Sequence, residues 1–420
     1  MHKTARWWSL PLGLALLLSA CHTPAPPQVS PLHVAPRAAF RADKLAEMDA
    51  AIRDAIADKK LPGGVLWLER EGVAYHKAYG HRALIPAEEP MTEDTIFDAA
   101  SLTKVIATTP AILLLIERGQ IKVDAPVHTY IPEFTGDGKE AITVRHLLTH
   151  TSGLRPGLGA MPTWSGAERA IQLACAEKLR SLPGTNFVYS DINFILLGEV
   201  VRRVSGKPLN EFVAREIYQP LQMNDTGFLP AMTKRPRIAP TTQISDTEVV
   251  QPLIPVWLRG VVHDPTSRRM GGVAGHAGLF FTAADLARFA RMMLNGGTLD
   301  GVRIFKPETV RLMTSVQSPA VVPTRRGLGW DIDSPYSGPR GKLFPLGSYG
   351  HTGWTGTSLW IDPFSKTFLL FLSNRNHPTE VGNVISLRAR LGTLAAEAVV
   401  GFDFENVPGV LPARRLTGPP

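Results

Sequence analysis

The chain has 420 residues, of which 44% are hydrophobic and 20% are charged, and its formal net charge is +8. This length can form one large domain or two coupled layers, and the composition is ordinary for a soluble enzyme. The positive charge is spread along the chain without a basic helix, zinc-finger or RNA-binding motif, which argues against nucleic-acid recognition.

The N-terminus has the pattern of an export signal. Lys3 and Arg6 precede a short apolar run at residues 10–20. A charged segment followed by a short apolar one is typical of a secretory signal peptide, and the run is too short to span a bilayer as a mature helix. We therefore predict a signal peptide over residues 1–20.

The apolar run ends in Leu-Ser-Ala-Cys at Cys21, which resembles a bacterial lipobox. The resemblance implies cleavage before Cys21, lipid attachment to it, and a membrane anchor on the periplasmic side of a bacterial cell envelope. His22 favours the outer membrane, and the proline-rich residues 21–38 would form an extended linker. The alternative is an ordinary signal peptide cut near Ala20, with Cys21 incidental.

The chain has two cysteines, Cys21 and Cys175. If Cys21 is acylated, Cys175 has no partner within the chain and no disulfide framework can form. Cys175 lies in an apolar helical pattern, so we expect a buried core thiol.

Hydrophobic periodicity predicts an α/β domain of the α+β type at residues 39–410, followed by a tail at 411–420. The expected elements are a helix at 45–56, strands at 64–68 and 73–78, a helix from Ser101, helices at 191–201 and 282–294, a hairpin of strands at 357–361 and 367–373, and a helix at 384–399. Strands near both ends predict one antiparallel sheet flanked by helices, built from about 39–120 and 300–410. The mostly helical residues at about 121–299 would form an inserted layer.

The most informative motif is Ser-Leu-Thr-Lys, from Ser101 to Lys104, at the start of the apolar segment 105–116. Residues three apart share a helical face, so Lys104 can reach back to the Ser101 hydroxyl. A serine nucleophile needs an adjacent base, and a desolvated lysine beside a tyrosine can lose its proton near neutral pH. Tyr189-Ser190-Asp191 and His351-Thr352-Gly353 follow in that order. Taken alone, the motif is better explained by Ser101 as a helix N-cap and Lys104 as a solvated charge, and the two later motifs reverse this preference.

The ordered motifs resemble the serine beta-lactamase-related family of class C beta-lactamases, penicillin-binding proteins and related esterases. The resemblance covers about residues 45–400. Phe-Asp-Ala-Ala before Ser101 and the stretch 144–154 also fit. Gly-His-Ala-Gly-Leu at 275–279, followed by Thr-Ala-Ala-Asp at 282–285, resembles penicillin-binding protein 4B-like hydrolases. The implied fold is beta-lactamase/transpeptidase-like.

The resemblance implies a role for each catalytic position. Ser101 would be the acylated nucleophile, with Lys104 and Tyr189 as its proton-transfer partners. His351 would take the place of the lysine of a Lys-Thr-Gly motif on an edge strand. The backbone N–H groups of Ser101 and Trp354 would form the oxyanion hole.

Four residues are assigned to substrate binding: Asp191, Thr352, Gly353 and His276. Asp191 stands where the lactamases have a substrate-contacting asparagine, and an anionic carboxylate cannot donate that hydrogen bond. His351, with an ordinary pKa of about 6.5, replaces a permanent cation. We therefore predict poor beta-lactam hydrolysis and weak carboxylate binding that improves as His351 protonates. Two alternatives stay open: Asp191 can orient a neighbour, and the His276 loop can merely stabilise a bend.

The remaining histidines have simpler explanations. His146 and His150 are four residues apart, a spacing that can ligate a metal, but no third ligand follows, so we predict a structural pair at a helix end. For His263 and Asp264 we prefer a loop hydrogen bond to a place in the cleft. No G-x-S-x-G elbow or phosphate loop occurs, and neither a metal nor an organic cofactor is expected.

These features predict an exported serine hydrolase that cleaves an ester or amide, either a small ester or a cell-wall peptide, through a Ser101 acyl-enzyme. A beta-lactamase or DD-carboxypeptidase of the same family is one alternative. A non-catalytic penicillin-binding envelope protein is an alternative of another class. The expected partners are an ester, peptide or beta-lactam and the membrane, without nucleic acid.

Overall fold

The structure is a computed structural model that describes residues 39–160, 163–244 and 257–413. These residues belong to one compact unit. The predicted signal peptide, Cys21 and the proline-rich linker lie outside the described residues.

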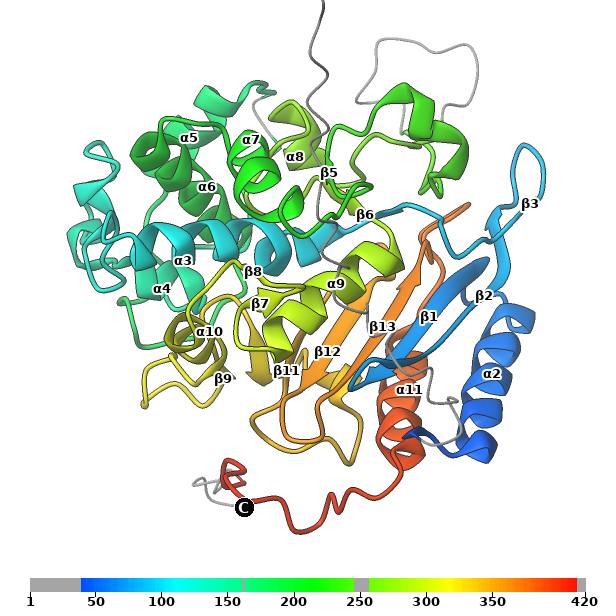
Figure 1. The fold of residues 1–420 in the computed structure, drawn as a ribbon. Coiled ribbons are helices and arrows are strands. Elements are labelled where there is room, and N and C mark those ends of the chain that lie inside the picture. Colours follow the sequence, from blue (N-terminus) through cyan, green and yellow to red (C-terminus); the bar gives the residue numbers. More distant parts are fainter. Residues whose placement is uncertain (1–38, 161–162, 245–256, 414–420) are drawn as a thin grey trace, which may run out of the picture. The chain divides into compact units, whose positions relative to one another are not determined.

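An antiparallel sheet of eight strands organises the described part of the chain, in the order β3-β2-β1-β13-β12-β11-β10-β9 (Figure 1). Its strands are β1 (Gly63–Arg70), β2 (Val73–Ala83), β3 (Glu89–Pro90), β9 (Arg325–Arg326), β10 (Asp331–Asp333), β11 (Tyr349–Thr352), β12 (Ser358–Asp362) and β13 (Thr367–Ser373). Strands β1 and β13 pair along their length, so the two ends of the domain complete one sheet. The predicted fold class is confirmed.

Helices cover both faces of this sheet (Figure 1). They are α2 (Ala42–Ala57), α3 (Thr109–Glu117), α4 (Val144–Leu148), α5 (Ala167–Ala176), α6 (Asp191–Ser205), α7 (Leu209–Val213), α8 (Pro265–Arg269), α9 (Ala283–Leu294), α10 (Pro307–Thr314) and α11 (Ile385–Ala398). Successive side chains of a strand point to opposite faces. In β13, Leu370 and Leu372 therefore join the core that contains α9, whereas Leu369 and Phe371 pack with α2 and α11.

The helical layer holds α3 against α6 and α7. A small sheet, β4 (Phe97–Asp98), β6 (Leu279–Phe281) and β5 (Gly227–Phe228), lies next to it, and β7 (Thr298–Leu299) pairs with β8 (Val302–Arg303). The pairing of β4 with β6 ties the segment before Ser101 to the chain after His276. The Thr282 hydroxyl caps α9 by accepting the Asp285 N–H at 3.2 Å.

Strand β11 is not the edge strand that the sequence predicted, since β10 and β9 lie beyond it. It pairs with β10 only at Gly350, opposite Asp331. His351 and Thr352 follow this last pair and are held by β12 alone on the other side. The short β10 therefore leaves the end of β11 open, and this end carries the predicted site residues.

Among the described residues one helical stretch, Ala100–Glu117, is long and apolar enough to cross a membrane. Its apolar window is 83% buried inside the protein, so it is the core helix that carries Ser101 at its start. Cys175 is buried as predicted, and burial raises the pKa of its thiol to about 11.

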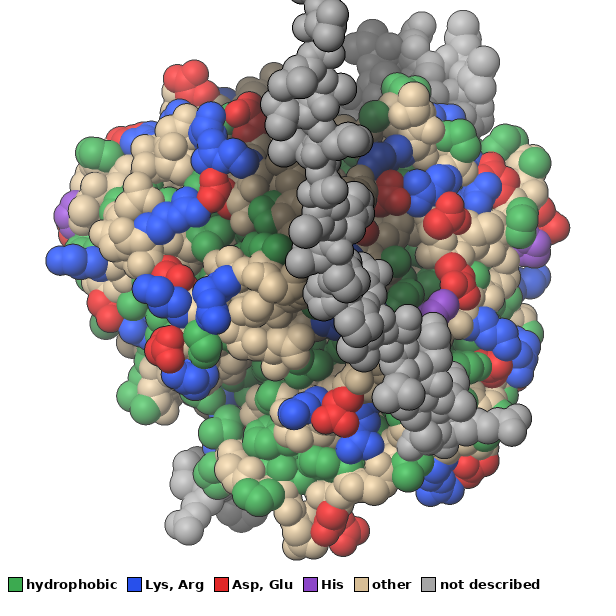
Figure 2. Space-filling view, viewed as in Figure 1, with side chains coloured by type: hydrophobic (Ala, Val, Ile, Leu, Met, Phe, Trp, Pro, Cys, Tyr) green, Lys and Arg blue, Asp and Glu red, His purple; other side chains and the backbone are tan. Residues whose placement is uncertain are grey.

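Charged side chains of both signs are interspersed over the visible face of the molecule (Figure 2). Lysine and arginine side chains there are mixed with aspartate and glutamate. Ion pairs occur among the described residues, such as Arg288 with Asp300 at 2.8 Å. On this face, the two signs of charge are therefore mixed rather than separated.

Candidate active site

The three sequence motifs meet in one cleft of about 590 Å³. Ser101 comes from the start of the core helix, Tyr189 from the loop before α6, and His351 from the end of β11. Thr352 and Gly353 line the same cleft. Segments that are far apart in sequence thus place a hydroxyl, a phenol and an imidazole around a common space.

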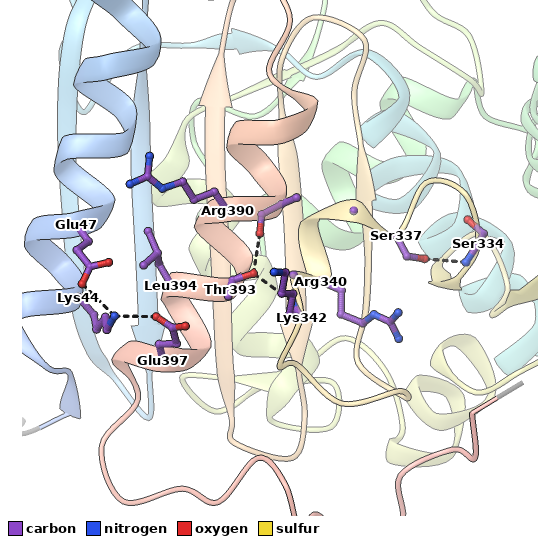
Figure 3. A pocket seen from close by; sticks show the side chains of 13 residues that line it. Lys44, Glu47, Ser334, Ser337, Arg340, Lys342, Arg390, Thr393, Leu394 and Glu397 are labelled. Atoms are coloured by element: carbon purple, nitrogen blue, oxygen red, sulfur yellow. Dashed lines mark hydrogen bonds and ion pairs between the residues drawn. The ribbon is translucent and has the colours of Figure 1, made fainter.

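A larger cavity, of about 730 Å³, lies between α2, α11 and the loop before β11 (Figure 3). Its charged groups partly satisfy one another, because Lys44 pairs with Glu47 and with Glu397, each at 2.9 Å. No residue of the three motifs lines this cavity. The smaller cleft is therefore the candidate active site.

Ser101 is presented by a strained turn. Ala100, just before it, has a φ of 46°, a left-handed conformation that is rare for residues other than glycine. Buried Asp98 holds this turn, since its Oδ1 accepts the Ala100 N–H at 2.8 Å and its Oδ2 accepts the His263 N–H at 2.6 Å. Burial raises the pKa of Asp98 to about 6. Asp98 thus fixes the backbone from which the Ser101 hydroxyl enters the cleft, a role that the motif did not reveal.

Lys104 is fully buried directly behind the serine. Its Nζ donates to Ser101 Oγ and to the His276 carbonyl, both at 3.1 Å. It also lies 2.7 Å from Asp191 Oδ1, as an ion pair rather than an aligned hydrogen bond. Lys104 therefore contacts the nucleophile, and its remaining contacts fix its position.

The charge of Lys104 differs from the sequence-based expectation. Burial lowers its pKa, but the Asp191 carboxylate and Tyr189 oppose burial, and the net result is a pKa above the ordinary value of 10.5. The idea that Lys104 loses its proton near neutrality is wrong for the free protein. Asp191 is the ion-pair partner of Lys104, which is the kind of contact that the alternative of orienting a neighbour describes.

We expect Asp191→Asn to move the alkaline limb of kcat/KM to lower pH. Without the carboxylate, burial of Lys104 is less opposed, so its pKa falls and its charge is lost at lower pH. The check is kcat/KM for p-nitrophenyl acetate from pH 6 to 11, corrected for spontaneous hydrolysis. As a control, Asp225→Asn removes the partner of Lys234, a 3.1 Å ion pair outside the cleft, and should leave the profile unchanged. An unmoved alkaline limb in Asp191→Asn contradicts the expectation.

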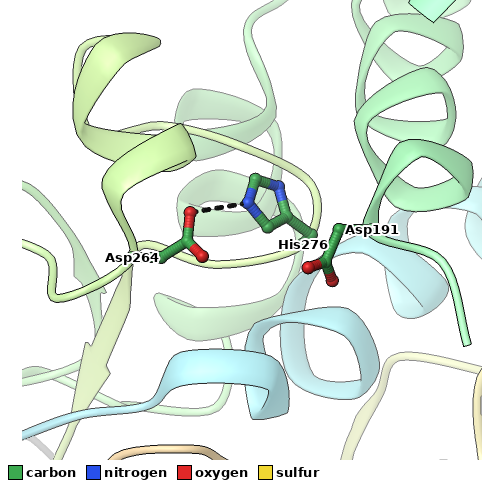
Figure 4. Close-up of side chains that lie close together, drawn as sticks. All are labelled: Asp191, Asp264 and His276. Carbon is green, nitrogen blue, oxygen red and sulfur yellow. Dashed lines mark hydrogen bonds and ion pairs between the residues drawn. The ribbon is translucent and has the colours of Figure 1, made fainter. Parts of the chain in front are cut away.

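His276 belongs to the support of Lys104 and not to the substrate-binding surface that the sequence predicted. Its ring is 1% exposed and does not line the cleft. Figure 4 shows the ring facing Asp264, with Nε2 2.8 Å from Oδ1. Asp264 also caps α8 by accepting the Ser267 N–H, which fits the predicted loop hydrogen bond. His276 therefore acts through its backbone carbonyl, the acceptor for Lys104.

Asp191, Asp264 and His276 have ligand atoms within 4.8 Å of one another, close enough to hold a metal ion (Figure 4). However, the Lys104 ammonium lies 2.7 Å from Asp191 Oδ1 and 3.1 Å from the His276 carbonyl. A metal ion beside Asp191 would be repelled at short range by this positive charge. The cluster is therefore the electrostatic support of Lys104.

Tyr189 is held by His150, a contact that the sequence analysis missed. The two rings stack with centroids 4.4 Å apart and an angle of 29°. His150 Nδ1 accepts the Ser190 N–H at 3.0 Å, and its carbonyl accepts the Val188 N–H at 3.0 Å. His150 thus binds the chain on both sides of Tyr189. Burial, and then the charges of nearby cations, hold its pKa well below 6.5, so the ring stays neutral and can accept this bond.

We expect His150→Phe to lower kcat by roughly 10- to 100-fold, because a small displacement of a reacting group has effects of that size. The phenyl ring can stack on Tyr189 but cannot accept the Ser190 N–H. His150→Asn should restore part of the activity, since its side-chain oxygen can accept that N–H and asparagine tolerates the left-handed φ of 58° at this position.

His146→Phe is the matched control, because His146 Nδ1 also accepts a backbone N–H, that of Thr143 at 3.2 Å, without contact to Tyr189. Both phenylalanine variants should lose thermal stability, but His146→Phe should keep kcat. Equal kcat in the two phenylalanine variants would show that His150 has no positioning role.

His351 is buried and uncharged at neutral pH. Burial, followed by the charges of Arg326 and Lys104, holds its pKa well below 6.5. Its Nδ1 lies 2.9 Å from the Thr352 carbonyl, which can only accept, so the Nδ1 carries the proton and Nε2 a lone pair. The expected gain in carboxylate binding as His351 protonates near pH 6.5 is therefore wrong.

The turn after β11 is packed against the segment before Ser101. The hydroxyls of Thr355 and Thr357 donate to the carbonyls of Asp98 and Ala99, at 2.8 and 3.0 Å. A Cβ on Gly353 would lie 2.5 Å from the Ala99 carbonyl, so only glycine fits there. The backbone N–H of Trp354 makes no hydrogen bond to another described residue. It is thus free to serve, as the resemblance implies, beside the nucleophile.

Arg388, at the start of α11, also lines the cleft and had no signal in the sequence analysis. It is buried, and its Nη2 donates to the carbonyls of Gly353 and Thr357, each at 2.8 Å. Burial lowers its pKa to about 9, so it remains charged at neutral pH. No carboxylate of the described residues forms an ion pair with it. The cleft therefore contains a cation that position 351 does not supply.

Comparisons with known proteins show the family and the fold of the chain. The family model described as Beta-lactamase matches residues 48–393. An Escherichia coli (strain K12) protein, provisionally named D-alanyl-D-alanine carboxypeptidase, is 32% identical and aligns over 90% of this chain and 92% of its own. The N-acetylmuramyl-L-alanine amidase of Bacillus subtilis (strain 168) is 34% identical over 81% and 83% of the two chains. Among solved structures, EstCE1, a hydrolase with promiscuous acyltransferase activity, matches 84% of this chain and 99% of its own with a TM-score of 0.67 at 22% identity, which shows a common fold.

Proposed function

The chain belongs to the beta-lactamase family and is a serine hydrolase of that fold, and from this premise we propose that it cleaves an ester or amide through a Ser101 acyl-enzyme. The observation that carries the proposal is the 3.1 Å contact of Lys104 Nζ with Ser101 Oγ, in the cleft that Tyr189 and His351 also line. A small ester or a cell-wall peptide is the proposed substrate.

The proposed reaction begins with attack of Ser101 Oγ on the scissile carbonyl carbon. Tyr189, acting in its phenolate form, accepts the Ser101 proton, and the charged Lys104 stabilises the negative charge on the phenolate and on the attacking serine oxygen. The carbonyl oxygen is bound by the backbone N–H groups of Ser101 and Trp354. The leaving alcohol or amine then takes the proton from Tyr189. Water finally hydrolyses the ester to Ser101 and releases the acyl group.

Trapping the acyl-enzyme tests the proposal directly. Wild-type protein is mixed with p-nitrophenyl acetate or a labelled penicillin, quenched in acid and digested for mass analysis. We expect a single adduct on the peptide that carries Ser101. An adduct elsewhere overturns the proposal, as does hydrolysis with no adduct at any quench time. A penicillin adduct that never turns over, with no ester hydrolysis, supports the non-catalytic penicillin-binding alternative.

A second candidate, a DD-carboxypeptidase, is favoured by Arg388, which lines the cleft, is charged, has no ion-pair partner among the described residues and has no hydrogen bond at its Nε. A peptide cut at its last residue carries a carboxylate one residue beyond the scissile bond, and a guanidinium binds a carboxylate strongly. The test compares an acyl-D-Ala-D-Ala peptide with the same peptide ending in an amide. A carboxypeptidase should prefer the acid by at least about tenfold, since charge-assisted hydrogen bonds contribute about 1.5–3 kcal/mol. Equal rates argue for an enzyme of neutral substrates.

We further propose that the protein is exported and anchored through lipid on Cys21, on the periplasmic side of the outer membrane. The support is the sequence pattern alone. Labelled fatty acid should appear in the wild-type protein and be absent from Cys21→Ser. Fractionation should then find wild type with the membranes and the variant in the soluble fraction. Labelling that survives in Cys21→Ser contradicts a lipid anchor at this residue.

A further inference from the structure

The mouth of the cleft is lined by large apolar side chains that are open to solvent. Tyr336, Trp354, Val381 and Ile385 are 46%, 60%, 88% and 66% exposed, and all four line the cleft that contains Ser101. They come from three segments: the loop after β10, the turn after β11, and the chain entering α11. Single exposed apolar residues are normal, but a group of them around one concave site marks a binding surface.

Trp354 is held rigidly within this group. The Arg375 guanidinium lies over its ring, 4.6 Å from the centroid, and Arg375 Nε donates to its carbonyl at 2.7 Å. Its indole N–H donates to Glu380 at 3.1 Å, and Glu380 also lies 3.1 Å from His263 Nε2. The polar parts of the indole are thus occupied, whereas more than half of the side chain is exposed. A fixed apolar surface can bind an apolar group with little loss of conformational freedom.

Most hydrogen-bond donors around the apolar residues are directed to backbone carbonyls. Arg375 donates to the Gly382 carbonyl at 2.6 Å, and Arg388 donates to two backbone carbonyls. His351, deeper in the cleft, is uncharged. A substituent that enters between Trp354 and Ile385 therefore meets carbon surface first.

We propose that Tyr336, Trp354, Val381 and Ile385 form a subsite for an apolar substituent of the substrate, an alkyl chain or an aromatic ring attached near the scissile bond. This inference rests on the proposed Ser101 chemistry and deepens it by naming the class of substrate. Each methylene buried on this surface raises the apparent affinity of the transition state by about two- to fourfold. The preferred substrates are hydrophobic esters or amides rather than acetyl esters of short alcohols.

Two substrate series test the subsite. One keeps p-nitrophenol as leaving group and lengthens the acyl chain, as acetate, butyrate and hexanoate. The other keeps the acetyl group and lengthens the alcohol, as ethyl, butyl and hexyl acetate, followed by acid release at constant pH. In wild type, kcat/KM should rise about two- to fourfold per methylene in at least one series. In the double variant Val381→Ser/Ile385→Ser, that rise should fall to less than half per methylene.

Val321→Ser is the matched control, because Val321 is another valine, 75% exposed, that does not line the cleft. It should keep the wild-type chain-length dependence. The subsite is overturned if neither series shows a rise in wild type, or if the double variant keeps the full rise. Both outcomes leave the acyl-enzyme proposal intact as long as the Ser101 adduct forms. Absence of that adduct removes the proposed function itself, so the two failures are distinguishable.

Discussion

Ser101→Ala is expected to lower ester hydrolysis by at least about 10⁴-fold, because removal of a nucleophile eliminates the covalent route and leaves only binding and oxyanion stabilisation. The substitution removes one oxygen from a half-buried side chain, so the fold should be kept. Lys104 loses one acceptor but keeps the His276 carbonyl and the Asp191 carboxylate. The measurement is kcat/KM for p-nitrophenyl butyrate, together with thermal unfolding of the same samples.

Ser205→Ala provides the control for this experiment. Ser205 is also half-buried, and its hydroxyl donates to the Val201 carbonyl at 2.7 Å at the end of α6, away from the cleft. This variant should lose some stability and no activity. Equal hydrolysis by wild type and Ser101→Ala would remove the catalytic hypothesis, and the alternative of a non-catalytic envelope protein would then gain support.

Much of the architecture could be predicted from the sequence, because the elements around the site have clear periodicity. The runs 64–68 and 73–78 predicted β1 and β2, and the run 367–373 predicted β13. Chain order then placed strands from both ends in one sheet. The motifs at Ser101, Tyr189 and His351 converge in one cleft, because each lies where a predicted helix or strand begins or ends.

The electrostatics of the site could not be predicted, because they depend on distances between segments that sequence spacing does not give. In the sequence, Asp191 takes the place of an asparagine in a motif. In the structure it lies 2.7 Å from Lys104 and raises the pKa of that lysine. His351 reads as a titratable replacement for lysine, yet burial keeps it neutral. For Lys104 and His351, the direction of the pKa shift follows from the burial of the group and from the charge nearest to it.

Residues that position others were also invisible in the sequence. By sequence spacing, His150 pairs with His146, four residues away. In the structure its ring stacks on Tyr189, across a loop. The sequence pointed to the side chain of His276 as a substrate contact, whereas its backbone carbonyl accepts a hydrogen bond from Lys104. Trp354 lines the cleft, whereas Trp330 is fully buried in the core. Contacts through the backbone or across loops leave no periodic pattern.

Lys104→Met is expected to lower kcat/KM by about 10³-fold, within the range that proton-transfer and charge-stabilising groups contribute. Methionine matches the length of the lysine stem, so the fully buried site should remain filled. Asp191 is left without its partner, but its side chain is 32% exposed and can be hydrated. The alkaline limb that depends on Lys104 should disappear from the pH profile of the residual activity.

Lys139→Met shows whether such a loss is specific, because Lys139 is the other buried lysine of the described residues. Its Nζ donates to the carbonyls of Cys175 and Glu177, at 2.7 and 3.2 Å, away from the cleft. Removing it leaves buried acceptors unpaired, so Lys139→Met should lose about 1–3 kcal/mol of stability and keep kcat/KM. If Lys104→Met retained more than a tenth of wild-type activity, the lysine would serve mainly to hold Asp191 and His276. Activation of Ser101 would then depend on Tyr189 and on the unprotonated Nε2 of His351.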